Sequence, residues 1–275
     1  MEAPRRPVIG FGVIAESDPG LTYKGYQPLM DYLTAHAPFL FQIRLGKTSE
    51  DLLTSVEERM AELAPLGAIS YLEAHKQFGA VPLVKPLNRS GEPLSRTVFI
   101  TREDSDLSSL NQLKGGSLVL GSHHSTFGNL IPRHELMRAG IDPHDLASIE
   151  HVDNDDEVVA AVLEGRFDAG AIEDVVSHTT ERVRVFHTSE PVPSAPLVIR
   201  GDLPQWVAQA IRDSLLQLDV SDAAKREAWA EEIRYGFRPA KDSDYEPVRK
   251  MVEAVGGQCA GSCHSSVEFS NTSGQ

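Results

Sequence analysis

The sequence predicts an α/β protein with two lobes and a cleft between them, and two observations support this prediction. Short apolar runs alternate with amphipathic segments in two separate stretches of the chain, which is typical of mostly parallel sheets flanked by helices. In addition, two similar β-rich segments, Thr97–Asp104 and Pro196–Asp202, lie on either side of the second stretch. We therefore expect the chain to cross from one lobe to the other and back.

The first stretch contains strand-like and helix-like patterns separated by residues that commonly break them. The expected elements are a strand at Val8–Ala15, a break at Glu16–Gly20, a helix that includes Pro28–Leu33, a strand at Phe39–Leu45, a helix at Ser49–Leu63, and a strand at Gly67–Ser70 that ends at Tyr71. This order predicts a doubly wound α/β sheet for the first lobe.

The second stretch repeats the alternation. The expected elements are a strand at Leu118–Leu120, a helix after Gly128 that stops at Gly140–Pro143, a strand at Ser148–Val152, a helix at Glu157–Leu163 and a strand at Asp168–Ile172. After the return crossing, amphipathic helices at Trp206–Leu218 and Ala223–Ile233 are expected to complete the first lobe.

These elements define the expected domain bounds. Residues 7–98 and 198–255 are expected to form the first lobe, and residues 99–197 the second. Gly, Ser, Asn and Gln dominate residues 256–275, which predicts a disordered tail. A hinge is expected near Phe99–Thr101 and Leu197–Ile199, where the chain passes between the lobes.

The composition limits the partners that the protein can have. The chain has 275 residues, of which 41% are hydrophobic, enough for substantial cores. Lys and Arg number 26 against 40 Asp and Glu, a formal net charge of −14. Because no basic cluster is present, nucleic acid is not expected as a partner. An acidic protein that binds an anion must use local donors, since its long-range field is repulsive.

The ends of the chain carry little information about its compartment. No stretch approaches the roughly 20 apolar residues of a membrane span, and the segment Met1–Ile14 is too short for a signal peptide. The chain is expected to be cytoplasmic as it stands, or periplasmic if a signal peptide was removed. The segment Cys259–His264 resembles a haem-attachment sequence lengthened by one residue. A flexible tail or a local disulfide between Cys259 and Cys263 is the expected reading, and no cofactor is expected.

The segment Gly121–Pro132 is the strongest candidate for a binding site. It places small hydroxyl residues between an expected strand and an expected helix. If Ser125 or Thr126 caps that helix, its hydroxyl and the free N–H groups of the first turn converge on one point, where the helix dipole also favours an anion. An ordinary capped helix is the simpler alternative for this segment taken by itself.

Two further groups of polar residues are expected near this loop. The pair His123–His124 can add a pH-sensitive donor, or can lie in solvent at the edge of the loop. His151 and Asp153 lie at the end of an expected strand that faces the proposed cleft, and ligands of open α/β sheets gather at the carboxyl ends of strands. The residues that the local pattern assigns to the site are therefore Ser122, His123, His124, Ser125, Thr126, Phe127, Gly128, His151 and Asp153.

Taken together, the segments of the chain from Pro7 to Val255 resemble the phosphonate-, phosphite- and phosphate-type periplasmic solute-binding proteins of ABC importers. The resemblance is carried by the order and spacing of Tyr26–Leu33, Gly67–Tyr71, Asp106–Leu107, Leu110–Gly115, Ser125–Pro132, Gly140–Pro143 and Val158–Ala171. It implies the type II periplasmic-binding-protein fold, in which two α/β lobes close on a small oxyanion. It also implies a monomer that delivers its ligand to an ABC permease.

The resemblance assigns roles to individual residues. Ser125 and Thr126 match the two leading hydroxyl residues of the family's anion-binding loop, and Tyr71 matches a tyrosine of the cleft. Glu173 lies near the family's acidic residue, which contacts an amine or a protonated ligand oxygen. This chain departs from the pattern at Phe127, which replaces a third hydroxyl, and at the preceding histidine pair. A phenyl ring cannot donate a hydrogen bond, so a ligand other than a phosphonate remains open.

Other functions are less well supported by the sequence. The same fold can serve as a sensor module that signals to a kinase, and the histidines can be imagined as a metal site, although no ligand signature is present. The segment Gly10–Ala15 has the glycine spacing of a dinucleotide fingerprint, but its glycines fall inside a strand, and Asp18–Gly20 is expected to prevent a helix from starting. Ser125, His151 and Asp153 lack the elbow of a hydrolase, so no catalysis is expected.

Overall fold

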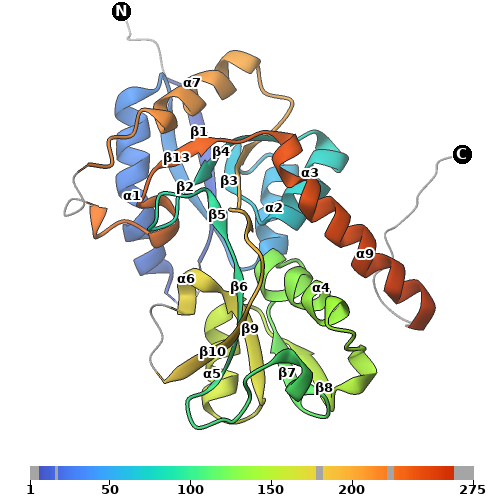
Figure 1. Cartoon of the computed structure of the whole chain (residues 1–275). Coiled ribbons are helices and arrows are strands. Elements are labelled where there is room, and N and C mark those ends of the chain that lie inside the picture. Colours follow the sequence, from blue (N-terminus) through green and yellow to red (C-terminus); the bar gives the residue numbers. More distant parts are fainter. Residues whose placement is uncertain (1–5, 16–17, 178–181, 222–225, 263–275) are drawn as a thin grey trace, which may run out of the picture.

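The computed structural model describes residues 6–15, 18–177, 182–221 and 226–262, which fold into two lobes (Figure 1). The first lobe contains a six-stranded sheet and the second a five-stranded sheet. The two-lobed α/β architecture expected from the alternation of strands and helices is confirmed.

The first lobe is built from both ends of the chain. Its strands lie in the spatial order β13 (Phe237–Pro239), β4 (Val81–Pro86), β12 (Leu197–Ile199), β3 (Leu63–Pro65), β1 (Val8–Ile14) and β2 (Leu40–Gly46). Its longer helices are α1 (Pro19–His36), α2 (Ser49–Glu57), α3 (Ala68–Phe78), α7 (Gln205–Leu216) and α9 (Glu246–Ser262). β1 is parallel to β2 and β3, whereas the returning strand β12 runs antiparallel to its neighbours.

The second lobe is built from the middle of the chain. Its strands lie in the order β10 (Val183–Thr188), β6 (Thr97–Arg102), β9 (Ala169–Glu173), β7 (Ser117–Leu120) and β8 (Ser148–His151). Its helical segments are η1 (Leu110–Leu113), η2 (Thr126–Leu130), α4 (Ile131–Arg138), η3 (Pro143–Asp145), α5 (Asp155–Leu163) and α6 (Asp174–Ser177). The central pairs are parallel, so loops that follow β7, β8 and β9 share one edge of the sheet.

Two short strands connect the lobes. β5 (Leu94–Ser95) pairs with β11 (Val192–Pro193) in a separate two-stranded sheet between the lobes (Figure 1). The residues expected at the hinge, Phe99–Thr101 and Leu197–Ile199, lie inside the larger sheets as parts of β6 and β12. A hinge at the crossing would therefore involve β5 and β11, which precede them along the chain.

The expected strand at Gly67–Ser70 is wrong, because this segment begins helix α3. The strand of this region is β3, which ends at Pro65. Gly67 is the residue that precedes the helix, and its carbonyl accepts a hydrogen bond from Tyr71 N–H at 2.8 Å. The preceding helix α2 is shorter than expected, since Arg59 has a φ of 67° and cannot continue it.

A second correction concerns the start of α1. Asp18 caps this helix by accepting hydrogen bonds from Gly20 and Leu21, and Pro19 occupies its first turn, where no N–H donor is needed. The expectation that Asp18–Gly20 prevents a helix is therefore wrong. Gly12 nevertheless lies inside β1, where a side-chain carbon would come within 2.6 Å of Leu52, so it serves close packing.

The C-terminal region differs from the sequence prediction. Of the helix expected at Ala223–Ile233, the structure shows a short turn, η4 (Glu231–Ile233), and residues 222–225 lie outside the described ranges. After another turn, η5 (Asp242–Tyr245), the unexpected helix α9 continues to Ser262, through the start of the expected disordered tail. Cys263 and His264 lie outside the described ranges, so the possible disulfide and haem-like motif stay untested.

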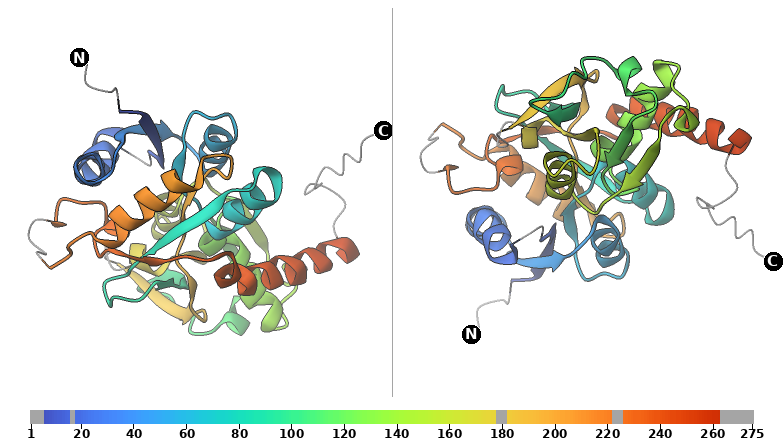
Figure 2. Two further views of the ribbon diagram at one scale, coloured as in Figure 1. Left: turned by 90° about the horizontal axis from the view of Figure 1, so that it is seen from above. Right: turned by 90° about the horizontal axis from the view of Figure 1, so that it is seen from below.

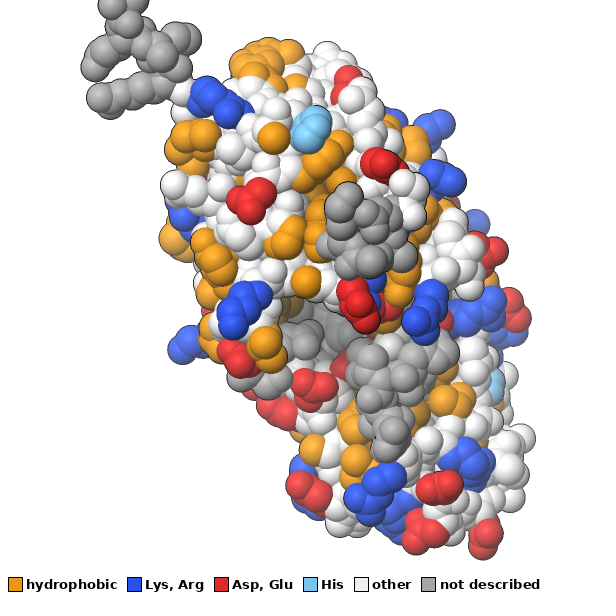
Figure 3. Space-filling view, turned by 90° about the vertical axis from the view of Figure 1, so that its left-hand side faces the viewer, with side chains coloured by type: hydrophobic (Ala, Val, Ile, Leu, Met, Phe, Trp, Pro, Cys, Tyr) orange, Lys and Arg blue, Asp and Glu red, His pale blue; other side chains and the backbone are white. Residues whose placement is uncertain are grey.

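Helix α9 links the lobes. It packs on α3 of the first lobe and on η2 and α4 of the second (Figure 1), and it lies on the opposite side of the molecule from α1 (Figure 2). The surface seen from the α1 side is hollowed where the lobes meet (Figure 3). None of the helices in the described ranges is long and apolar enough to span a bilayer.

Candidate functional site

The start of η2 brings the two lobes into direct contact. Ser125 precedes η2, and its hydroxyl accepts a hydrogen bond from Gly128 N–H at 2.8 Å. The next residue, Thr126, is only 3% exposed, and its hydroxyl accepts a hydrogen bond from Ile69 N–H at 3.1 Å. Ile69 belongs to the first turn of α3 in the other lobe. The N-terminal ends of two helical segments therefore meet at Thr126.

Close backbone packing fixes the shape of this loop. Gly121 N–H donates to the Gly128 carbonyl at 2.9 Å, and a side-chain carbon on Gly128 would lie 3.1 Å from Gly121 Cα. A larger residue at Gly128 would therefore force the backbone at Gly121 to shift by a few tenths of an ångström. The hydroxyl of Thr97, at the start of β6, donates to the Phe127 carbonyl at 2.7 Å and so attaches the loop to the sheet of the second lobe.

Phe127 contributes to a hydrophobic core that both lobes share. Its side chain is 6% exposed and lies in one cluster with Leu130 and Ile131 of the second lobe and with Tyr71 and Val248 of the first. The phenyl ring, which the resemblance marks as a departure, thus takes an apolar role between the lobes. It offers no donor to an anion.

The two histidines of the loop have different environments. His124 reaches the first lobe, where its Nε2 lies 2.8 Å from Glu50 and its Nδ1 lies 3.6 Å from Glu73. His123 is exposed, and its ring stacks on that of His151 with centroids 3.8 Å apart. His124 therefore faces two carboxylates of the other lobe, and an anion contact from either histidine stays a prediction.

His151 is held in its neutral form. Its Nε2 lies 3.1 Å from Asn129 Oδ1, while the Asn129 amide donates to the His123 carbonyl at 2.7 Å. Burial lowers the pKa of His151 to about 4, with smaller contributions from the charges of His123 and Arg133. His151 thus donates to Asn129, which does not place it with Ser125 in a catalytic arrangement.

Ser122 and Asp153 make contacts within the second lobe. The Ser122 carbonyl accepts a hydrogen bond from Ser125 N–H at 2.8 Å, so this residue shapes the turn. Asp153 is exposed, and its N–H donates to Glu157 at 3.3 Å. These contacts lie within the second lobe, and both residues stay candidates by position alone.

Glu173 lies in an acidic cluster at the end of β9. The Ser95 hydroxyl lies 2.5 Å from Glu173 Oε1 and 2.9 Å from Asp174 Oδ1. Since one hydroxyl has one hydrogen, both contacts are satisfied when Glu173 is protonated and donates to Ser95. The N–H of Glu173 donates to Asp155 at 2.9 Å. Across the cleft, Glu232 of the first lobe accepts a hydrogen bond from Tyr26.

Two carboxyl groups of this cluster have strongly shifted pKa values. Burial, helped by the charges of Asp155, Asp174 and Glu232 and opposed by the hydrogen bond with Ser95, raises the pKa of Glu173 to about 8. Burial likewise raises the pKa of Asp155 to about 6. The acidic side of the site therefore carries less negative charge at neutral pH than its residues suggest.

Replacing Glu173 with glutamine is expected to change how stability depends on pH. A carboxyl whose pKa rises on folding, here from 4.5 to about 8, favours the folded state when protonated, so its contribution is lost as pH increases through this range. As pH rises from 5 to 8.5, the unfolding free energy of the wild type is expected to fall by roughly 1–3 kcal/mol relative to that of Glu173→Gln, after allowance for screening. Urea unfolding measures this difference. The exposed Glu164→Gln is the control, and parallel pH profiles for wild type and Glu173→Gln would contradict the assignment.

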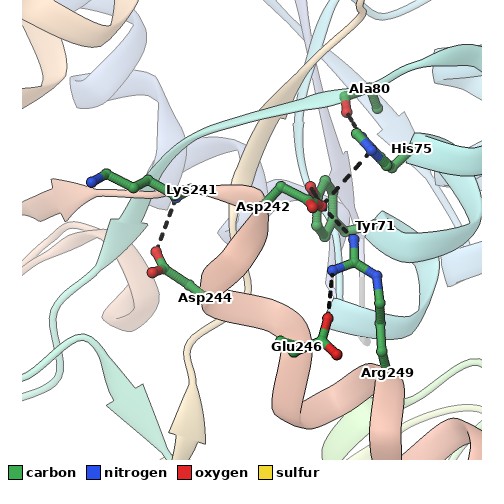
Figure 4. Close-up of polar contacts among 8 residues, drawn as sticks. All are labelled: Tyr71, His75, Ala80, Lys241, Asp242, Asp244, Glu246 and Arg249. Atoms are coloured by element: carbon green, nitrogen blue, oxygen red, sulfur yellow. Dashed lines mark hydrogen bonds and ion pairs between the residues drawn. The ribbon is translucent and has the colours of Figure 1, made fainter.

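Tyr71 is engaged inside the first lobe. It is fully buried, and its hydroxyl donates to Asp242 at 2.6 Å (Figure 4). Arg249 of α9 also bonds Asp242, and His75 Nε2 lies 3.8 Å from the same carboxylate. Burial, with the hydrogen bond to Asp242, raises the pKa of Tyr71 above its usual range. A ligand contact from this hydroxyl would require the Asp242 bond to break.

Several residues around the site carry no recognisable signal in the sequence. Ile69, Glu50 and Glu73 lie opposite the loop, while Asp242 and Arg249 fix Tyr71. No local motif distinguishes them. Within the described ranges, no group of three or more His, Cys, Asp or Glu side chains is arranged to hold a metal ion.

Comparisons with known proteins agree with this architecture. At a TM-score of 0.81 and 18% identity, the structure matches PhnD1 from Prochlorococcus marinus (MIT 9301) in complex with methylphosphonate, covering 92% of this chain and 99% of that one. A binding-protein component of an ABC phosphonate transporter from Pseudomonas aeruginosa matches with the same score and identity, covering 96% and 92%. A Xanthomonas citri protein bound to ATP matches at 0.71 and 24% identity, covering 91% and 97%.

The family assignment comes from the sequence as a whole. Residues 11–245 match the model of the family described as ABC transporter, phosphonate, periplasmic substrate-binding protein. This match covers most of the chain and confirms the resemblance that the segment order predicts. The chain therefore belongs to the periplasmic substrate-binding proteins of phosphonate ABC transporters.

Proposed function

We propose that the protein binds a phosphonate, or a similar small oxyanion such as phosphite or phosphate, between its two lobes and delivers it to an ABC permease. Family membership supports the transport role. The complex of PhnD1 with methylphosphonate supports the ligand class, since that protein shares the fold over nearly its whole length.

The contact between Thr126 and Ile69 is the observation that carries this proposal. It places the first turn of α3 and the start of η2 on opposite sides of one point. Backbone N–H groups at helix starts favour anions, and hydroxyls can turn to donate. An anion oxygen between the lobes would accept from Ile69 N–H in place of the Thr126 hydroxyl, and Thr126 and Ser125 would donate to it.

The acidic cluster refines the ligand class. A side-chain carbon at Gly121 would lie 3.4 Å from Gly128 Cα and 3.6 Å from Asp155 Oδ1, so the loop and the cluster adjoin. Glu173 and Asp155 are suited to an amino group or to a protonated ligand oxygen. This arrangement favours an anion that also carries a donor, such as an aminoalkylphosphonate or a monoprotonated phosphonate.

The protein is proposed to be a binding protein and not an enzyme. The Ser125 hydroxyl accepts from Gly128 N–H, and His151 bonds Asn129, so no activated nucleophile is formed between them. The proposed compartment is the periplasm, in keeping with the family. The alternative is that the protein is a sensor module, whose partner would be a kinase instead of a permease. Neighbouring genes for a permease and an ATPase would favour transport, and a histidine kinase gene would favour sensing.

A panel of oxyanions tests the ligand class. Methylphosphonate, an aminoalkylphosphonate, phosphite, phosphate and sulfate are titrated by calorimetry and compared by thermal unfolding. At 100 times Kd, a ligand stabilises the folded state by about 2.7 kcal/mol, which gives a clear rise in Tm. At least one phosphorus oxyanion is expected to bind more tightly than sulfate, which has no protonated oxygen at neutral pH. Absence of binding by all phosphorus oxyanions would refute the proposal.

A further inference from the structure

The side chain of His124 forms a bridge between the two lobes. It extends from the loop after β7 in the second lobe to two helices of the first. Its Nε2 lies 2.8 Å from Glu50 Oε1 on α2, and its Nδ1 lies 3.6 Å from Glu73 Oε2 on α3. The side chains of His124 and Glu73 are 30% and 24% exposed, whereas that of Glu50 is 68% exposed. The pair with Glu73 is therefore the less screened of the two.

Both ring nitrogens of His124 face a carboxylate. A neutral imidazole has one N–H donor and one acceptor, so it would present a lone pair to one of these carboxylates. An imidazolium has two donors and satisfies both. The protonated form of His124 therefore matches this juxtaposition of the lobes, and separation of the lobes would remove its partners.

Burial opposes a positive charge at His124, whereas its charged neighbours favour one. The charged groups that act on it are Glu50 from α2 and Glu73 from α3, and both favour protonation. Its chain neighbour His123 turns away to stack on His151.

We propose that His124 is a proton-dependent latch that holds the lobes closed around the bound ligand, so that ligand affinity decreases as pH rises. The proposal rests on the proposed function, in which closure retains the ligand. His124 acts as a positioning residue, since its contacts are with the opposite lobe. In the sequence, His124 is a candidate for an additional anion donor. In this proposal it instead stabilises the closed arrangement of the lobes.

The direction of the pH effect follows from the environment of His124. The carboxylate of Glu73, 3.6 Å from Nδ1, together with that of Glu50, raises the pKa of His124 above 6.5 in the closed arrangement, against the lowering effect of burial. In the open arrangement these partners are lost, and the pKa returns toward its ordinary value. The latch is therefore fully engaged below pH 6.5 and is lost as pH rises through the raised pKa.

Calorimetric titration with methylphosphonate at pH 5.5 and pH 9 tests the latch. The ligand, Glu173 and Asp155 also titrate, so the quantity compared is the ratio of Kd values for His124→Gln and wild type at each pH. At pH 5.5 the variant is expected to bind about three- to fivefold more weakly, and at pH 9 the ratio should approach one. His144→Gln, which changes an exposed histidine of the same lobe, is the control and should give a ratio near one at both pH values.

A double-mutant cycle assigns the effect to the bridge. His124→Gln and Glu73→Gln should be non-additive at pH 5.5 and additive at pH 9, because only the imidazolium couples to the carboxylate. A Kd ratio that is independent of pH, or additive effects at pH 5.5, would overturn the latch.

A measurement without ligand separates this proposal from the proposed function. Small-angle scattering of the ligand-free protein should show a larger radius of gyration at pH 9 than at pH 5.5, and His124→Gln should be expanded at both. Such a result supports the latch even if methylphosphonate does not bind, in which case the ligand class fails alone. An unchanged radius in wild type, together with a constant Kd ratio, rejects the latch while leaving the ligand class intact.

Discussion

Replacing Phe127 with alanine is expected to lower the free energy of unfolding by about 3–5 kcal/mol. The ring is almost fully buried in the cluster that joins Leu130 of the second lobe to Tyr71 and Val248 of the first. Removing it loses the transfer free energy of the ring and leaves a cavity between elements held by their own backbone bonds. Urea unfolding at 25 °C, with the slope of free energy against urea compared between proteins, measures the loss.

A matched variant separates packing from backbone effects. Phe127→Leu keeps most of the apolar volume and is expected to cost less than about 1.5 kcal/mol. If Phe127→Ala lost under 1 kcal/mol, the ring would not be part of a core shared by the lobes. Phe127→Ser introduces the kind of hydroxyl that the family loop carries, and should destabilise at least as much as alanine, because it also buries a polar group.

The double variant Ser125→Ala with Thr126→Val is expected to weaken methylphosphonate binding by about 100-fold or more. Each hydroxyl is proposed to donate to an oxyanion, and a hydrogen bond to a charged group contributes about 1.5–3 kcal/mol. Two such bonds correspond to more than two factors of ten in Kd. Calorimetric titration at constant salt and pH measures the loss, and thermal unfolding without ligand shows whether the variant is folded.

Two variants control this experiment. Thr126→Ser retains the hydroxyl and should keep Kd within about tenfold of the wild type, since it removes only a methyl group. Ser108→Ala removes an exposed hydroxyl of the same lobe and should leave Kd unchanged. Wild-type affinity in the Ser125→Ala, Thr126→Val protein would show that the anion is held elsewhere.

The fold was predictable because it depends on patterns that recur along the chain. Alternating strands and helices indicated α/β lobes, and the two similar β-rich segments on either side of the second stretch indicated two of them. The segment Gly67–Ser70 was misassigned because four apolar or small residues fit a buried strand and the first turn of a buried helix equally well. Likewise, Asp18 caps α1 at the place where Pro19 and Gly20 suggested a break.

The site was predictable only where its geometry is local. Ser125 caps η2 through a bond to Gly128, as its position before the helix indicated. The partner of Thr126 lies 57 residues away in α3, and the partner of Tyr71 lies 171 residues away in η5. Such pairings depend on how the lobes meet, which a single sequence does not encode in any short motif. The ligand roles of the site residues stay predictions until ligand binding is measured.

Helix α9 couples the loop at Thr126 to the first lobe through its packing on η2 and α4. η2 continues directly into α4, so any movement that draws Thr126 away from α3 also moves α4. α4 packs on α9, which the bond from Arg249 to Asp242 anchors to the first lobe. Helix α9 therefore connects the lobes in addition to strands β5 and β11 and to the contacts of Thr126 and His124. Any separation of the lobes must therefore change the packing of α4 and η2 on α9 as well as the two connecting strands.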